Sequence, residues 1–84
     1  MLMVEMVEVD SSNIHSIGYD PKKQELYVQF KGDGARLYKY LQVPPMVWEH
    51  MLRAGSKGTF LRKIVIPYFQ VTQAETLVTA ISKK

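Results

Sequence analysis

The sequence of 84 residues contains no cysteine, and this absence excludes disulfide bonds and every thiolate metal site. It also lacks an uninterrupted apolar run of about 18 residues, which a membrane-spanning helix requires. The first stretch, MLMVEMVEV, has no basic region, and glutamates interrupt it, so we expect no secretory signal. These absences predict a soluble, cytoplasmic protein without membrane contact.

Patterns of catalytic and metal-binding residues are missing as well. The two histidines, His15 and His50, have no partners at ligand spacing, and no group of carboxylates supports a metal site. No nucleophile stands with a base and an oxyanion donor in a recognisable arrangement. We therefore expect a protein that is not an enzyme and that needs no cofactor or metal.

Charge is present but unevenly spread. The net charge is +3, yet residues 1–12 carry three acids and no base, while residues 13–69 carry nine bases and four acids. The basic central region is compatible with a polyanionic partner. The length suits one small domain with a modest core.

Alternating apolar residues indicate a small antiparallel sheet. The turns DPKKQ and KGDGA join its strands, and the apolar count fixes a register, since a one-residue slip would exchange the two faces. Residues 3–9 form either a further strand or a mobile lead. The predicted strands are 14–19, 25–30 and 36–41; one face carries Ile17, Tyr19, Leu26, Val28, Phe30, Tyr38 and Tyr40, and the other carries Ser16, Gly18, Tyr27, Gln29, Leu37 and Lys39.

Helical patterns follow the sheet. Two prolines suit a helix start, an apolar stripe of Val47, Trp48, Met51 and Leu52 follows, and Gly55 suits the helix end. The second helix, over 57–65, is capped by Ser56, has its own stripe of Phe60, Leu61, Ile64 and Val65, and ends before Pro67. A capping box at Thr72 and Glu75 predicts a last helix over 73–82.

The predicted fold class is therefore α+β. A three-stranded antiparallel meander, with a fourth amino-terminal strand as an alternative, is packed against two to three short helices. The expected division is an extension or extra strand over 1–10, a domain over 11–69 and a helical extension over 70–84.

The ordered set of motifs over residues 11–69 resembles the KTSC domain. The residues that carry the resemblance are Ser11, Ile14, Gly18, Tyr19, Asp20, Tyr38, Tyr40, Ser56, Gly58 and Phe60. This module is found at the carboxyl end of some lysyl-tRNA synthetases and as a small stand-alone bacterial protein. The resemblance implies RNA binding by analogy with the synthetases. Where the family pattern has an asparagine in the second helix, this chain has Arg62 and Lys63.

Tyr38 and Tyr40 allow two interpretations. The register places both on the apolar face, which favours core packing across strands, and base stacking is the alternative. Gly18, Tyr19 and Phe60, like these two tyrosines, are assigned mainly structural roles. Trp48 is expected to anchor the first helix to the sheet.

Two candidate anion-binding sites remain. On the other face, Tyr27 and Lys39 form a surface pair that suits base stacking, or else a half-exposed tyrosine covered by a lysine stem. The second helix begins with Ser56, Lys57 and Gly58, which suits phosphate binding or simply a capped helix start. Arg62 and Lys63 follow in that helix.

The sequence thus predicts a small binding module for RNA or another polyanion, with Tyr27, Lys39, Ser56, Lys57, Gly58, Arg62 and Lys63 as candidate site residues. The alternative is a protein-interaction or homodimerisation module that uses the terminal extensions, because both extensions are apolar on one side.

Overall fold

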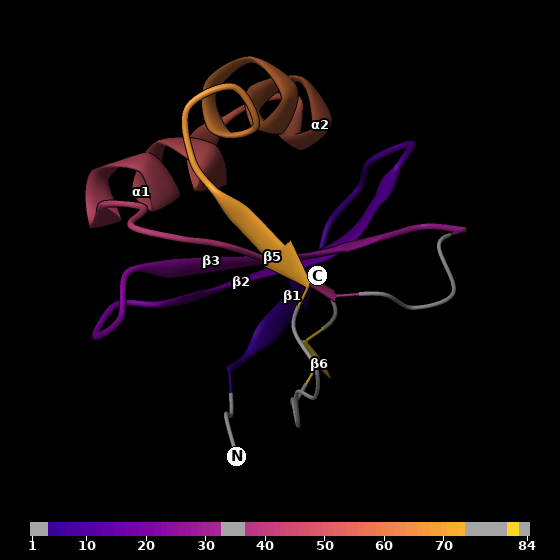
Figure 1. The fold of residues 1–84 in the computed structure, drawn as a ribbon. Coiled ribbons are helices and arrows are strands. Elements are labelled where there is room, and N and C mark those ends of the chain that lie inside the picture. The colour runs from indigo at the N-terminus through magenta and orange to yellow at the C-terminus, as the bar shows by residue number, and fades with distance from the viewer. Residues whose placement is uncertain (1–3, 33–36, 74–80, 83–84) are drawn as a thin grey trace.

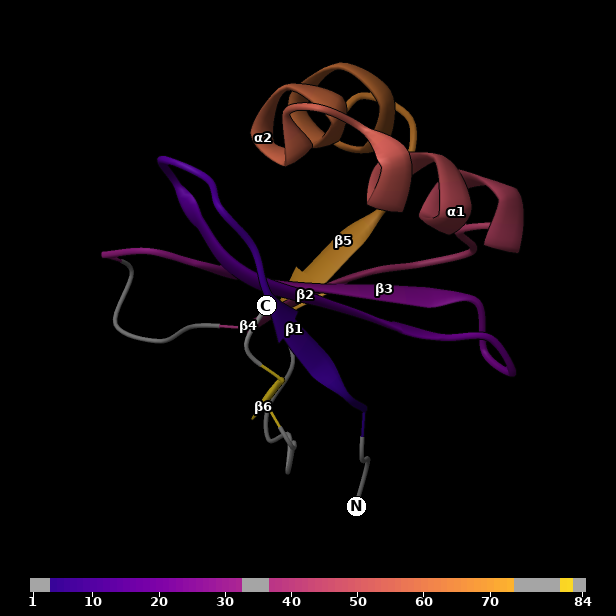
Figure 2. The same ribbon diagram turned by 180° about the vertical axis from the view of Figure 1, so that it is seen from behind.

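The computed structural model describes residues 4–32, 37–73 and 81–82 of the chain. Its strands form one sheet, and the helical segments lie together on one face of that sheet (Figure 1 and Figure 2). The predicted α+β class is confirmed. The elements in chain order are β1 (Met6–Glu8), β2 (Ile14–Asp20), β3 (Glu25–Phe30), β4 (Leu37–Tyr40), α1 (Pro45–Arg53), α2 (Lys57–Phe60), the π-helical turn η1 (Leu61–Val65), β5 (Val71–Gln73) and β6 (Ile81–Ser82).

Six strands among the described residues pair in the order β5-β4-β3-β2-β1-β6. All neighbours are antiparallel except β1 and β6, which are parallel. The central strands β2, β3 and β4 are the predicted meander, and β1 confirms the amino-terminal strand. The predicted count was still too low, because β5 and β6 are only three and two residues long and show no alternation that a sequence pattern could detect.

The carboxyl-terminal segment differs from its prediction. Strand β5 contains Gln73 and strand β6 contains Ile81, so the predicted helix over 73–82 is wrong at both ends. The middle of that segment lies outside the described residues. Thr72 pairs with Lys39 of β4 instead of capping a helix, because backbone bonding to an open sheet edge outweighs a local capping signal.

The predicted register of the meander is confirmed. A bulge at His15 interrupts the β2–β3 ladder, because Ile14 pairs with Phe30 whereas Ser16 pairs with Gln29. Beyond the bulge, the alternation of faces follows the prediction. The central pairs are Ile17 with Val28, Gly18 with Tyr27, Tyr19 with Leu26, Leu26 with Tyr40, Tyr27 with Lys39 and Val28 with Tyr38.

The first core fills the space between the sheet and the helices. Trp48 of α1 stacks on Tyr19 of β2, with ring centroids 5.5 Å apart and planes at 10°. The Tyr19 hydroxyl donates a hydrogen bond to the Val43 carbonyl just before α1, which fixes the helix approach. Trp48 is thus the predicted anchor. The buried members of this core are Ile14, Ile17, Leu26, Val28, Tyr40, Val43, Met51, Leu61 and Val65.

The helices keep their predicted places but differ at their ends and faces. Helix α1 ends at Arg53, the next residue Ala54 is extended, and Gly55 is not a left-handed cap. Helix α2 continues into η1, where the Ile66 N–H donates to the Leu61 carbonyl at 2.9 Å, a bond that spans five residues. Leu52 and Ile64, which the sequence assigned to the apolar stripes, are exposed. We call α1, α2, η1 and the turn that follows, residues 45–68, the helix layer.

A second core lies on the opposite face of the sheet. Tyr27 is completely buried there by Val4, Met6 and Leu37. The amino-terminal segment can approach this closely because Gly18 has no side chain: a Cβ at Gly18 would lie 2.6 Å from the Met6 sulfur. The second face of the sheet is therefore covered around Tyr27, whereas the sequence predicted packing on one face.

Replacing Gly18 with alanine should destabilise the fold, because the new methyl group would also lie 2.8 Å from the Glu5 carbonyl oxygen. Overpacking of this kind costs about 1–3 kcal/mol, which urea unfolding followed by circular dichroism measures. The matched control is Gly55→Ala, whose Cβ meets nothing within 4 Å. It should change the free energy of unfolding by less than about 0.5 kcal/mol. Equal stability of the two variants would contradict the close packing of the amino-terminal segment on β2.

Candidate functional site

The predicted stacking residue is not on the surface. Tyr27 has no exposed area, since the second core covers its ring. Val4 and Met6 occupy the space beside this ring that Gly18, which has no side chain, leaves open. The prediction of an exposed Tyr27 is therefore wrong, because a glycine beside an aromatic residue admits another chain segment as readily as a ligand.

Polar partners engage both Tyr27 and Lys39. The Tyr27 hydroxyl donates to Glu25 Oε1 at 2.9 Å, and Lys39 Nζ lies 3.8 Å from Glu25 Oε2. Burial raises the pKa of the Tyr27 phenol, and the hydrogen bond to Glu25 and the nearby negative charges raise it further. The three groups form a polar cluster, in which Lys39 is paired with a carboxylate of its own sheet.

Tyr38 and Tyr40 lie on the core face, as the register predicts. Tyr40 is buried in the first core, and burial raises its pKa, with a smaller contribution from Tyr38. Tyr38 is half-buried and packs edge-on against Phe30, with ring centroids 5.6 Å apart. Core packing is thus the interpretation that the structure supports for both tyrosines.

The start of α2 is a capped helix start with its polar groups engaged. Ser56 Oγ accepts from the Thr59 N–H at 3.2 Å and donates to Thr59 Oγ1 at 3.0 Å. The Lys57 ammonium donates to the carbonyls of Leu52 at 3.1 Å and Ala54 at 2.8 Å. Lys57 thus supplies donors to carbonyls at the end of α1, which have no partner within the helix and carry partial negative charge. The capped interpretation is therefore favoured over phosphate binding.

Gly58 is a packing position. A Cβ there would lie 2.8 Å from Asn13 Oδ1 and 3.5 Å from Ser11 Oγ. Ser11 Oγ in turn accepts the N–H groups of Asn13 and Ile14 and so shapes the turn before β2. The glycine thus lets α2 approach this turn closely.

Arg62 and Lys63 remain as exposed cations. Within the described parts of the chain, neither has an ion pair or a side-chain hydrogen bond. They lie on the helix layer, whereas Tyr27 and Lys39 lie across the sheet. The seven candidate residues are therefore not brought together into one site.

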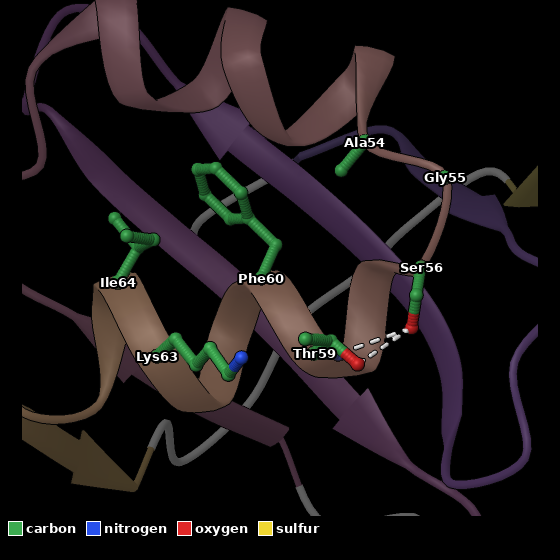
Figure 3. Close-up of a pocket in the computed structure, with 7 residues that line it drawn as sticks. All are labelled: Ala54, Gly55, Ser56, Thr59, Phe60, Lys63 and Ile64. Carbon is green, nitrogen blue, oxygen red and sulfur yellow. Dashed lines mark hydrogen bonds between the residues drawn. The ribbon is translucent and has the colours of Figure 1, made fainter.

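A pocket that the sequence did not reveal lies at the junction of α1 and α2 (Figure 3). It has a volume of about 330 Å³ and is lined by residues 54–56 and by Thr59, Phe60, Lys63 and Ile64. No sequence signal marked this pocket, because Ile64 has the helical spacing of a core residue and only the structure shows that it is exposed. We call this cavity the junction pocket.

The electrostatic setting of the junction pocket is positive. Residues 45–69 contain four basic residues, Arg53, Lys57, Arg62 and Lys63, and one acidic residue, Glu49. Lys63 lines the pocket, and no acidic side chain does. The pocket thus combines apolar walls with a cation, which suits an apolar group attached to a negatively charged one.

The described residues contain neither a cluster of metal-binding side chains nor a membrane-spanning helix. No group of three or more His, Cys, Asp or Glu side chains there could hold a metal ion. No helix in the described part of the chain is both long and apolar enough to cross a membrane.

Comparisons with known proteins agree on one family. The model of the KTSC domain matches residues 10–69. A protein of Tsukamurella paurometabola is 43% identical over 65 residues, which are 77% of this chain and 94% of that protein. The crystal structure of a KTSC domain protein from Yersinia pestis aligns with a TM-score of 0.79 at 35% identity, covering 86% of this chain and 99% of that one. A lysine–tRNA ligase of Nostoc punctiforme is 32% identical over 68 residues, which are 81% of this chain but 12% of the ligase.

The buried phenol of Tyr27 should make the fold less stable in alkali. Its pKa in the folded chain is raised above 10, the ordinary value, so the unfolded chain loses this proton first. The stability that the buried phenol of Tyr27 contributes is therefore fully present below pH 10. Above pH 10, the free energy of unfolding falls by up to about 1.4 kcal/mol per pH unit. Urea unfolding at several pH values measures this slope.

Tyr27→Phe should reduce the slope of the free energy of unfolding against pH by the contribution of about one proton. The control is Tyr68→Phe, which removes an exposed phenol and should leave this slope unchanged. Identical slopes in Tyr27→Phe and the unaltered chain would count against a buried, neutral phenol.

Lys57→Met should lower stability, because the carbonyls of Leu52 and Ala54 lose a charged donor at the end of α1. The expected loss is about 0.5–1 kcal/mol in urea unfolding. Lys63→Met is the matched control, since Lys63 has no described partner, and it should change stability by less than about 0.5 kcal/mol. A loss as large in Lys63→Met would show that net charge, rather than the cap, is responsible.

Proposed function

The chain belongs to the KTSC domain family, and we propose that it is a small non-catalytic binding module that docks a protein partner on its helix layer. The observation that carries this proposal is where large apolar side chains are exposed. Five of the six among the described residues lie on the helix layer: Met46, Leu52, Ile64, Ile66 and Tyr68. Exposed apolar residues that are concentrated in one layer of a fold favour a site of protein interaction there.

The kind of side chain supports a protein partner over RNA. Four of these five residues are aliphatic or thioether side chains, which provide apolar contact area but no ring for base stacking. The predicted stacking residue, Tyr27, is buried, and two of the predicted cations, Lys39 and Lys57, already have partners. Among the described Phe, Trp and Tyr residues, Tyr68 is the one exposed ring, so the helix layer offers one position for base stacking and four for purely apolar contact.

RNA or another polyanion remains the second candidate. Arg62 and Lys63 favour it, since both are exposed and without a described partner, and one relative is a lysine–tRNA ligase. Dimerisation through the amino-terminal extension has less support, because Val4 and Met6 are used inside the second core of the same chain.

Site-specific photocrosslinking in the source cell tests the proposal. A benzophenone amino acid at Ile66 or at Tyr68 should form crosslinks to the same protein, because both side chains are exposed on the helix layer. The control position is Lys22, which is exposed in the turn between β2 and β3. It should give no such crosslink.

Mass spectrometry then distinguishes the candidates. Crosslinks to a protein at Ile66 and Tyr68 but not at Lys22 support the proposal. Crosslinks to RNA would support the second candidate instead. Absence of crosslinks at the helix layer, or equal yields at Lys22, would contradict both.

A further inference from the structure

The junction pocket is a shallow depression that is largely open to solvent, and side chains from two helical elements line it. Phe60 and Ile64 project from α2 and η1 toward the same side and form its apolar wall (Figure 3). Ala54 and Gly55 close it at the end of α1. The volume of about 330 Å³ lies at the lower end for small-molecule sites. It therefore suits one large side chain better than an extended ligand.

The hydroxyl groups of the pocket are already engaged. Ser56 and Thr59 hydrogen-bond to each other, as the dashed lines in Figure 3 show. Little directional bonding is left for a polar ligand, since the remaining lining side chains, apart from Lys63, carry no polar atoms. Recognition inside the pocket must then rest on apolar contact and shape.

Positive charge in the pocket lining, and in residues next to it in the sequence, favours a negatively charged partner. Lys63 lines the pocket, Arg53 directly precedes the lining segment, and Arg62 is next to Lys63 in the chain. All three are exposed, and the one acidic residue of the helix layer, Glu49, is not part of the lining. Acidic groups flanking the inserted side chain would thus meet complementary charge.

We propose that the junction pocket receives one large apolar side chain from an acidic peptide segment of the protein partner, with Lys63 contacting a carboxylate beside that anchor. This inference rests on the proposed function and adds what the partner presents. Many interfaces concentrate their binding energy in a few anchor residues that fill pockets on the partner.

A filled pocket tests the apolar part. Gly55 is not left-handed, and a Cβ there meets nothing within 4 Å, so a side chain can be added without strain. A randomised synthetic peptide library is selected on the full chain, and enriched peptides should share an apolar residue flanked by Asp or Glu. Their affinity, measured by fluorescence anisotropy, should fall about tenfold or more in Gly55→Leu. Gly55→Ala, which leaves most of the cavity open, should bind like the unaltered chain.

A charge reversal tests the polar part. Lys63→Glu should weaken the binding of the enriched peptides about tenfold or more. The loss of affinity should be larger for peptides that contain more Asp and Glu. Lys23→Glu makes the same charge change in the exposed turn between β2 and β3 and should have little effect. Urea unfolding of each variant confirms that the fold is retained.

Several results would overturn the inference. These are no enrichment at all, enriched peptides without the apolar and acidic pattern, equal binding by Gly55→Leu, or competition by an RNA pool with equal strength. If these occur while crosslinks at Ile66 and Tyr68 still join a protein, the proposed function stands and only the pocket assignment fails. If the crosslinks fail too, the proposed function fails with it.

Discussion

Three consecutive fully buried residues in β3 impose the main constraint on this fold. Leu26, Tyr27 and Val28 have no exposed area, although successive side chains of a strand point to opposite faces. Such a strand must be covered on both sides. The helices cover Leu26 and Val28, and the amino-terminal segment covers Tyr27. Strand β1 is therefore part of the fold, rather than an appendage to it.

The two motif glycines serve this double covering. Gly18 admits Met6 and the backbone of Glu5 against β2, and Gly58 admits the turn around Asn13 against α2. Both belong to the set of residues that resembles the family pattern. The role of these glycines is to allow backbone and side chains to approach closely. Tyr38 and Tyr40, which also belong to that set, pack in or against the first core. The recognisable features of the sequence thus specify packing, while the proposed docking surface is formed by other residues.

The limits of prediction follow from the range of each signal. The register of the meander was predicted correctly because strands β2 and β3 are seven and six residues long and alternate clearly. Strands β5 and β6 carry no such period, and their pairing depends on neighbours distant in sequence. Tyr27 was assigned to the correct face, but the sequence could not show that a second layer covers it. The capping of Ser56 was predicted, whereas the partners of Lys57 depend on where α1 ends.

The prediction of the buried helical stripes was wrong at two positions. Leu52 and Ile64 have the spacing of core residues, yet both are exposed, because short helices that meet at the junction pocket bury less than their full apolar faces. Met51, Leu61 and Val65 complete the contact with the sheet. The excess apolar residues therefore have no structural role within the described chain, although each costs free energy when exposed to water. Contact with a partner would remove that cost.

The basic residues that the fold does not use also lie on the helix layer. Lys39 is paired with Glu25 in the sheet, and Lys57 completes the end of α1, so these cations serve the fold. Arg62 and Lys63 have no such use among the described residues, and they lie in the same helical segment as Ile64. The helix layer therefore combines exposed apolar and exposed basic side chains that have no use within the described fold. A partner that is apolar at one point and acidic around it satisfies both sets at once, which neither a bare polyanion nor a purely apolar surface would do.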